Sequence, residues 1–284
     1  MHARLEDEQP KRVPRLHARA SAWYEQEGML EPAFRHALEG EDVAQAIHIA
    51  ETHGRPMLLR GELTALRRWI AALPAERVRQ SAELSVLSAW VRLLTGQISS
   101  VKHHLQLAES LPTEGHHLHG DVATIRAYAA AEGGEIGHAV TLAERALELM
   151  GEDKKGEQGV AYFVLSGTRM MQGDLHGAAE AARRAADVGQ RGGNLHIVLP
   201  ALNTLASVQM TLGELHEAQA TAEAALERAT PASGKLLPIA ASPSRCWRTW
   251  PWNGTSWSAR KTSPGRRWSS ANAGAIRTIS VPPI

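Results

Sequence analysis

Residues 134–150 read GEIGHAVTLAERALELM, and this stretch contains the pattern that decides the fold of the chain. Its opening turn, GEIGHA, recurs in related form as GQISSV at 96–101, GDLHGA at 173–178 and GELHEA at 213–218. The leading glycines follow one another at intervals of 38, 39 and 40 residues. A fixed period of this length is typical of helical-repeat solenoids, in which each repeat buries its apolar face against its neighbours.

The residues of the recurring turn predict how one helix ends and the next begins. We expect each leading glycine to adopt the left-handed conformation that ends a helix. An acidic residue follows in three of the four turns, where a negative charge stabilises a helix start. We then expect an apolar residue that points inward and, three positions later, an alanine on the same face that lets paired helices approach closely. These residues are Ile136, Leu175 and Leu215, followed by Ala139, Ala178 and Ala218.

The segments between the turns have helical periodicity, as at Leu84, Leu87, Val91 and Leu94. Aromatic residues make up only 5% of the chain, while Ala and Leu are abundant, which favours helices over strands. The sequence therefore predicts an all-α fold, a tetratricopeptide-like (TPR-like) superhelix with a period of about 38–40 residues. The predicted helix pairs are 81–95 with 97–109, 121–132 with 135–149, 158–172 with 174–188, and 197–212 with 214–229.

A weaker version of the repeat precedes these pairs. We assign residues 81–240 to the TPR-like repeats and residues 14–80 to N-terminal helical repeats. Within the N-terminal part, periodicity predicts helices at 14–27, 31–39, 42–53 and 61–73.

Residues 241–284 differ in composition from the rest of the chain. They hold five of the eight tryptophans, the only cysteine and no Asp or Glu, and they lack helical periodicity. We interpret this segment as an irregular tail that results from a frameshift near residue 241. A genuine disordered tail, and an arm that binds nucleic acid through interleaved Trp and Arg, remain as alternatives.

The composition limits the cellular compartments and the classes of partner that we expect for the chain. A single cysteine excludes an intrachain disulfide and a thiolate zinc site. The N-terminus is too charged for a secretory signal, and no apolar run reaches the roughly 20 residues of a membrane span, so we expect a cytoplasmic protein without membrane contact. Seven basic residues lie in 241–284, which leaves 24 basic and 30 acidic residues in 1–240, a net charge of −6. Such a body lacks the basic footprint of a nucleic-acid-binding domain.

Several histidines are candidate metal ligands by residue type. His116 and His117 follow Gly115 in a predicted connection between helices, but metal sites also need further ligands in defined geometry. We therefore interpret this group as solvated, and the histidines that accompany three of the four turns as a repeated position at a helix start. The first group is His103, His104, His116, His117 and His119, and the second is His138, His176 and His216.

Other candidate chemistry is equally sparse. The chain contains no phosphate-binding loop of the G-x-x-x-x-G-K-S/T type. The pair Glu144 and Glu148 lies one turn apart on a predicted helix, where such pairs are common on solvated faces. Cys246 has no base partner in the sequence pattern. We expect the large aromatic residues to be core anchors, and we assign no catalytic, cofactor-binding or metal-ligating residue; the ligand-binding residues are unknown. The aromatic residues are Trp23, Tyr24, Trp69 and Trp90.

Three segments resemble the MalT-like family, the large ATP-binding transcription activators of LuxR type. They are 12–51, which begins RVPRLHARASAWYEQEG, together with 61–74, GELTALRRWIAALP, and 84–97, LSVLSAWVRLLTGQ. The resemblance covers residues 4–240. It implies that residues 1–13 are the remnant of a preceding winged-helix region.

The resemblance implies a sensor segment that binds an inducer or a protein partner on a helical superhelix. Family members place an ATP-binding switch before this superhelix and a DNA-binding helix-turn-helix after it, and neither is readable in this sequence. ATP and DNA are therefore implied only for a full-length relative, and we interpret the chain as the product of a truncated gene. The alternative function is a stand-alone TPR-type adaptor between proteins. Loss of a terminal capping repeat predicts self-association, and we expect no enzymatic activity.

Overall fold

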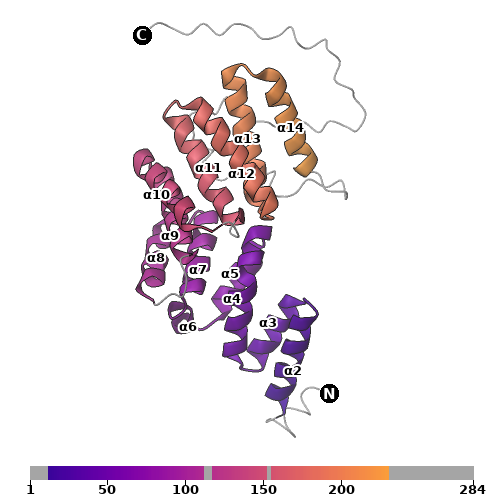
Figure 1. Ribbon diagram of the computed structural model, residues 1–284. Helices are drawn as coiled ribbons and strands as arrows, with labels where there is room; N and C mark the ends of the chain where they lie inside the picture. The colour runs from indigo at the N-terminus through magenta and orange to yellow at the C-terminus, as the bar shows by residue number, and fades with distance from the viewer. Residues whose placement is uncertain (1–11, 112–116, 152–154, 230–284) are drawn as a thin grey trace.

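The computed structural model of the chain describes residues 12–111, 117–151 and 155–229. In these ranges the chain forms thirteen α-helices, one short 3-10 helix and no strand, which confirms the all-α prediction. Figure 1 shows the helices stacked in a curved array from α2 at one end to α14 at the other. The predicted tail at 241–284 lies outside the described residues.

Four consecutive helix pairs follow the predicted repeats. The leading glycine of each turn has a positive φ, between 78° and 83°, so the predicted left-handed ends of the preceding helices are confirmed. The pairs are α7 (Ala82–Leu94) with α8 (Val101–Ser110), α9 (His117–Glu132) with α10 (Ile136–Leu149), α11 (Lys155–Met171) with α12 (Leu175–Arg191), and α13 (Leu195–Leu212) with α14 (Leu215–Ala229). A 3-10 turn, η1 (Ile98–Ser100), precedes α8.

The small residues of the turns lie where helices pack closely. Ala139 and Ala178 are fully buried and Ala218 is 5% exposed, as predicted. Leu215 does not point inward, however, since its side chain is 59% exposed. It belongs to α14, and no described helix packs beyond α14 to cover it.

The N-terminal helices differ from the predicted ones in two places. Helices α2 (Val13–Gln26), α3 (Leu30–Glu39) and α5 (Leu63–Ala72) match, whereas α4 (Val43–Arg60) continues seven residues past the predicted end. Pro56 lies inside α4 without ending it, because the buried Met57 and Leu58 hold the last turn against the core. A short helix, α6 (Ala75–Arg79), was not predicted.

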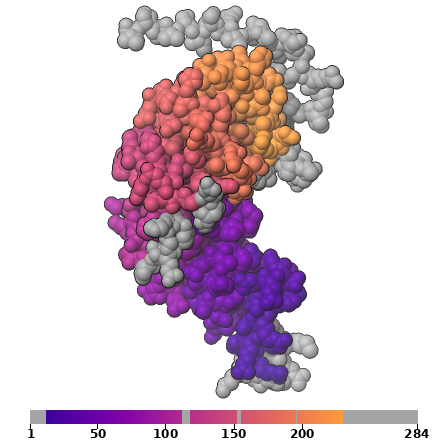
Figure 2. Space-filling model, in the orientation of Figure 1, coloured from indigo at the N-terminus to yellow at the C-terminus, as the bar shows by residue number. Residues whose placement is uncertain are grey.

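The stack curves toward the first helices of the pairs. The first helices of successive pairs contact one another, with α7 packed on α9, α9 on α11 and α11 on α13. The second helix of a pair also packs on the first helix of the next pair, as α10 does on α11 and α12 on α13. Among the described helices, the second helices of neighbouring pairs share no comparable contact. We call the tighter side the inner face, and α4 packs there against both α7 and α13. Figure 2 shows the resulting elongated, curved body.

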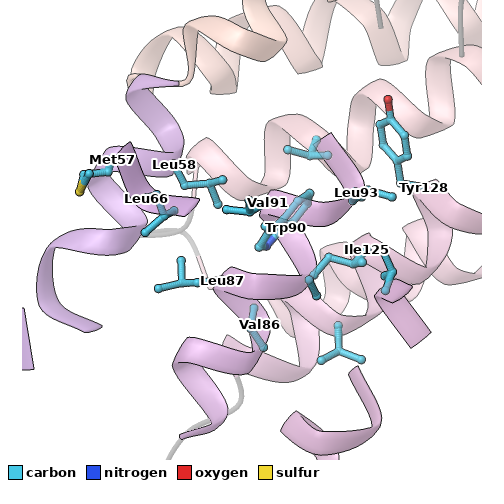
Figure 3. Packing of buried hydrophobic residues seen from close by; sticks show 14 of the residues in the cluster. Met57, Leu58, Leu66, Val86, Leu87, Trp90, Val91, Leu93, Ile125 and Tyr128 are labelled. Atoms are coloured by element: carbon cyan, nitrogen blue, oxygen red, sulfur yellow. The ribbon is translucent and has the colours of Figure 1, made fainter. Parts of the chain in front are cut away.

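The aromatic residues are divided between core and surface. Trp69 and Trp90 are each only 2% exposed, which confirms them as core anchors, whereas Trp23 is 52% exposed and Tyr24 is partly buried. Trp69 stacks on Phe34 with 4.5 Å between ring centroids and donates its indole N–H to Glu31. Figure 3 shows Trp90 of α7 among the apolar residues that join α4, α7 and α9. Burying a large apolar side chain of this kind stabilises a fold by about 1.5–3 kcal/mol.

Candidate functional site on the inner face

A pocket lies on the inner face where α4, α7, α11 and α13 converge. It encloses about 350 Å³ of empty space, a volume that includes the open solvent at its mouth. Its walls are mostly aliphatic, with a few polar groups that give it a direction for hydrogen bonding. The lining residues are Leu58, Leu59, Trp90, Leu94, Glu157, Val160, Asn194, His196 and Ile197.

Trp90 supplies an indole N–H without a protein acceptor. Its Nε1 atom is buried, and no described residue accepts a hydrogen bond from it. A buried donor left unpaired costs about 1–3 kcal/mol, so most are satisfied in folded proteins. The other tryptophan of the core, Trp69, has an acceptor for its indole N–H, because its Nε1 lies 2.6 Å from Glu31 Oε2. Trp90 therefore lines the pocket and carries a buried N–H that no described residue accepts.

An ionic cluster lies beside the pocket and joins four helices. Arg55 of α4 donates through Nη2 to Asp121 Oδ2 of α9 at 2.8 Å and to Glu83 Oε1 of α7 at 3.0 Å. Its Nη1 donates to Glu157 Oε1 of α11 at 3.0 Å. Glu157 also lines the pocket. One guanidinium therefore faces three carboxylates at the junction of the N-terminal helices with the repeats.

Burial destabilises the charged form of one carboxylate in this cluster, that of Asp121. Burial by itself lowers the pKa of Arg55, but the three neighbouring carboxylates outweigh it and raise that pKa, so the guanidinium stays charged. Burial raises the pKa of the Asp121 carboxyl, and the contact with Arg55 offsets the rise only in part. Asp121 Oδ1 is buried and accepts no hydrogen bond from the described residues. The cluster thus sets three carboxyl groups against one guanidinium, and burial disfavours the charged form of Asp121.

The far side of the pocket is closed by contacts between α13 and the end of α4. His196 lies against the backbone of Gly61, which follows α4 and has a φ of 80°. Burial lowers the pKa of His196, and a hydrogen bond to the Gly61 backbone partly opposes that change. Asn194 is 5% exposed and donates through Nδ2 to the Gly156 carbonyl at 3.0 Å. The pocket is therefore built from segments more than 100 residues apart in the sequence.

The structure does not bring the histidine candidates together into a site. His103 and His104 are neighbours on α8, while His138, His176 and His216 are exposed near the starts of three different helices. His119 is exposed on α9, His117 begins that helix, and His116 lies outside the described residues, as does Cys246.

The carboxylate pair Glu144 and Glu148 lies on the exposed face of α10. Glu144 contacts Arg169 at 3.6 Å and Glu148 contacts Arg145 at 2.8 Å, which are ordinary surface ion pairs. Among the described residues, one group of histidine and carboxylate side chains is close enough to share a metal ion. It consists of His17, His36 and Glu39, near the N-terminal end of the stack.

Sequence reasoning missed the residues of the inner face. Trp90 was singled out only as a core anchor, and Arg55, Asp121, Glu157, Asn194 and His196 were not singled out at all. One signal was present, since Asp121 stands among buried apolar residues of α9, where a charge needs a partner. That signal does not identify the partner, which lies on another helix.

No described helix is both long and apolar enough to cross a membrane. No solved structure matches the chain significantly.

Comparison with curated proteins places the chain beside transcription regulators. It is 26% identical over 220 residues to the HTH-type transcriptional regulator MalT of Serratia proteamaculans, and 27% identical over 221 residues to that of Yersinia pestis. Each match covers 76% of this chain and 24% of the relative. A shorter match, 35% identical over 94 residues, links it to the serine/threonine-protein kinase PknK of Mycobacterium tuberculosis, covering 33% of this chain and 8% of that protein.

The chain thus spans about a quarter of the length of its MalT relatives. The family model of the MalT-like TPR region matches residues 120–249, which begin in the first turn of α9 and include α10 to α14. Residues 120–249 of the chain are thus similar to a MalT-like TPR region, and 76% of the chain is similar to MalT regulators.

Proposed function

We propose that this chain is the sensor segment of a transcription regulator, which binds an inducer or a partner protein on its inner face and catalyses no reaction itself. The observation that carries this proposal is the unpaired indole N–H of Trp90, a residue that lines the pocket. The similarity to MalT regulators supports the regulatory role. ATP and promoter DNA enter the proposal only through other domains of a longer protein. The cytoplasm is the compartment in which such a regulator acts.

The lining of the pocket defines the chemistry of its ligand. Trp90 offers a donor, and the Glu157 carboxylate offers acceptors. Leu58, Leu94 and Ile197 offer apolar walls. A ligand group that carries an acceptor and a donor on a small apolar frame satisfies both polar residues. We expect an inducer of that kind to bind there, or a polar side chain presented by a partner protein.

The position of the pocket supports a route by which binding would be relayed. A ligand there contacts α4 and α13 at once, so it stabilises the arrangement in which these distant helices are joined. Binding shifts a conformational equilibrium only by the difference in affinity for the two states. A ligand that needs both walls binds the joined arrangement more tightly, and neighbouring domains sense that change.

The test is a thermal-shift screen of the purified chain against small polar compounds, with two matched tryptophan variants. Trp90→Phe removes the unpaired N–H, whereas Trp69→Phe removes an N–H already donated to Glu31. We expect an active compound to raise the melting temperature of the wild type and of Trp69→Phe, and to raise that of Trp90→Phe much less, because a lost hydrogen bond weakens binding.

For the partner form of the proposal, the same two variants are compared in a binding assay with proteins that co-purify with the wild type. A partner retained by Trp69→Phe and lost by Trp90→Phe supports binding at the inner face. Equal binding by both variants, of compounds and of proteins alike, contradicts the proposed site. Turnover of any substrate by the pure chain contradicts the absence of catalysis.

A further inference from the structure

The first two described helices bring three potential metal ligands into contact. His17 lies in α2, and His36 and Glu39 lie three residues apart in the last turns of α3. His17 Nδ1 is 2.9 Å from His36 Nδ1. Glu39 Oε2 is 3.4 Å from His17 Nδ1 and 3.3 Å from His36 Nδ1. All three atoms therefore converge on one point between the helices.

These separations match the coordination sphere of a small divalent ion. Donor atoms about 2.0–2.1 Å from a tetrahedral zinc ion lie about 3.3 Å from one another. The two nitrogen–oxygen distances agree with this value, and the shorter nitrogen–nitrogen distance corresponds to a narrower angle at the metal. An ion about 2 Å from all three atoms lies just outside their plane, with a position left for water.

The hydrogen bonds that the three atoms could form with one another conflict. If one imidazole Nδ1–H donates to the other Nδ1, the accepting nitrogen faces the lone pairs of Glu39 Oε2. If both Nδ1 atoms carry protons and donate to the carboxylate, two N–H groups face each other at a nitrogen–nitrogen distance of 2.9 Å. A metal ion removes this conflict, because it accepts a lone pair from each of the three atoms.

The surrounding residues hold the ligands in place. A Cβ atom at Gly40 would lie 2.8 Å from His17 Cβ, so only glycine lets the end of α3 approach α2 this closely. Tyr24 stacks on the His36 ring with 5.4 Å between centroids. Arg35 Nε lies 3.8 Å from the other oxygen of Glu39, Oε1. Such supporting contacts orient ligands in metal sites.

The two helices are also fastened beside the cluster, and the cluster is open to solvent on one side. Ser21 Oγ of α2 donates to the Ala33 carbonyl of α3 at 2.9 Å, and both residues are fully buried. The side chain of His17 is 11% exposed and that of Glu39 is 46% exposed. An ion therefore has a route from solvent to a site whose walls are already built.

We propose that His17, His36 and Glu39 bind one divalent transition-metal ion of the zinc type, which links α2 to α3. Two imidazole nitrogens and one carboxylate oxygen form the ligand set of open zinc sites, and the Ca²⁺ and Mg²⁺ ions prefer oxygen ligands alone. The site lies away from the inner-face pocket. Its occupant fastens the N-terminal hairpin to which the rest of the stack is joined.

The experiment measures zinc binding by the full chain, purified without a polyhistidine tag and stripped of metal with a chelator. Titration calorimetry gives stoichiometry and affinity, and cobalt substitution gives a visible absorption that reports the coordination number. We expect one tight zinc ion in the wild type, and an affinity lower by about tenfold or more in His17→Gln and in Glu39→Gln. Zinc also raises the melting temperature of the wild type more than that of the two variants.

The control is His138→Gln. His138 also lies three residues from a glutamate, Glu135, with 3.6 Å between them, but that pair belongs to no group of three ligands in the described part of the chain. We expect its zinc affinity to equal that of the wild type. Since Glu39 is half exposed, Glu39→Gln keeps the fold even if His17→Gln does not, and circular dichroism checks both. An absence of zinc binding by the wild type overturns the proposal, as does unchanged affinity in folded Glu39→Gln.

Discussion

Gly61 and His196 touch so closely that a Cβ atom at Gly61 would lie 1.4 Å from His196 Nε2. Gly61→Ala therefore requires His196 to move, in addition to the cost of placing a side chain at a φ of 80°. A left-handed backbone alone costs a non-glycine residue about 1–2 kcal/mol. Overpacking against His196 adds a second cost. We therefore expect Gly61→Ala to lower the free energy of unfolding by about 1–3 kcal/mol beyond the cost of the left-handed backbone. Chemical denaturation followed by circular dichroism measures the change.

The matched control for this substitution is Gly213→Ala. Gly213 has a φ of 83°, nearly the same as Gly61, but no atom lies within 4 Å of its missing Cβ. Gly213→Ala should therefore lower the free energy of unfolding only by the cost of a left-handed backbone. Equal losses of stability in the two variants would show that His196 does not press against Gly61 in solution.

Arg55 should be the most sensitive residue of the ionic cluster. Arg55→Met removes the cation that pairs with Glu83, Asp121 and Glu157, and no other described residue supplies one there. Breaking a buried ion pair from one side costs about 3–5 kcal/mol, because the remaining charge stays buried without a partner. We expect Arg55→Met to lower the free energy of unfolding by that amount, as measured by urea denaturation. Arg60→Met serves as the control, since the Arg60–Glu62 pair is half exposed and should contribute little.

Asp121 should make the stability depend on pH. Its pKa is raised in the folded chain by burial, so the folded state favours the protonated carboxyl. The stabilisation that protonated Asp121 gives the folded state is therefore complete below the ordinary pKa of an aspartate. It is lost as the pH rises through the pKa of Asp121 in the folded chain. The neutral variant Asp121→Asn lacks this loss. We expect Asp121→Asn to gain stability relative to the wild type as the pH rises from about 4 to 7.

The measurement for Asp121 is the difference in unfolding free energy between the two proteins at each pH, which cancels the titration of other groups. Asp121→Ala is the informative comparison, because it removes the contact with Arg55 as well as the charge. It should be less stable than Asp121→Asn throughout. A difference between wild type and Asp121→Asn that does not change with pH would contradict the raised pKa.

His104 should destabilise the fold in acid. Burial lowers its pKa to about 4, with further contributions from Arg92 and His103, and its Nδ1 atom is buried without a partner among the described residues. The folded chain favours the neutral ring, so stability is retained above the ordinary pKa of about 6.5 and is lost as the pH falls toward 4.

Thermal melts between pH 7 and pH 4.5 check this prediction for His104. We expect His104→Leu to lose less of its melting temperature over this range than the wild type does. His176→Leu, at an exposed position on α12, should follow the wild type. The prediction fails if the two variants respond to acid alike.

The repeats were predictable because their signals are local. Three of the four turns place a glycine, an acid and an alanine within six residues, and the structure places Gly134 and Ala139 as that spacing requires. Local rules also explain the one large error in a helix boundary. Pro56 usually ends a helix, but the burial of Met57 and Leu58 against other helices outweighs the lost hydrogen bond.

The candidate sites were not predictable because their residues meet only after folding. Arg55 and Glu157 are 102 residues apart, and His17 and His36 are separated by a turn and belong to two helices. No local spacing identifies such pairs. A single sequence therefore indicates the architecture of a repeat protein more readily than its sites, whose residues are contributed by different repeats.

The contact between Gly61 and His196 also changes the mechanics of the molecule. A stack in which each repeat touches only its neighbours stretches and twists easily, because small rotations at every junction add up. Here the end of α4 is joined to the start of α13, so the intervening turns form a closed loop whose ends do not separate freely. The stack is stiff across that span, so elastic deformation concentrates outside it, at α2 and α3 on one side and at α14 on the other.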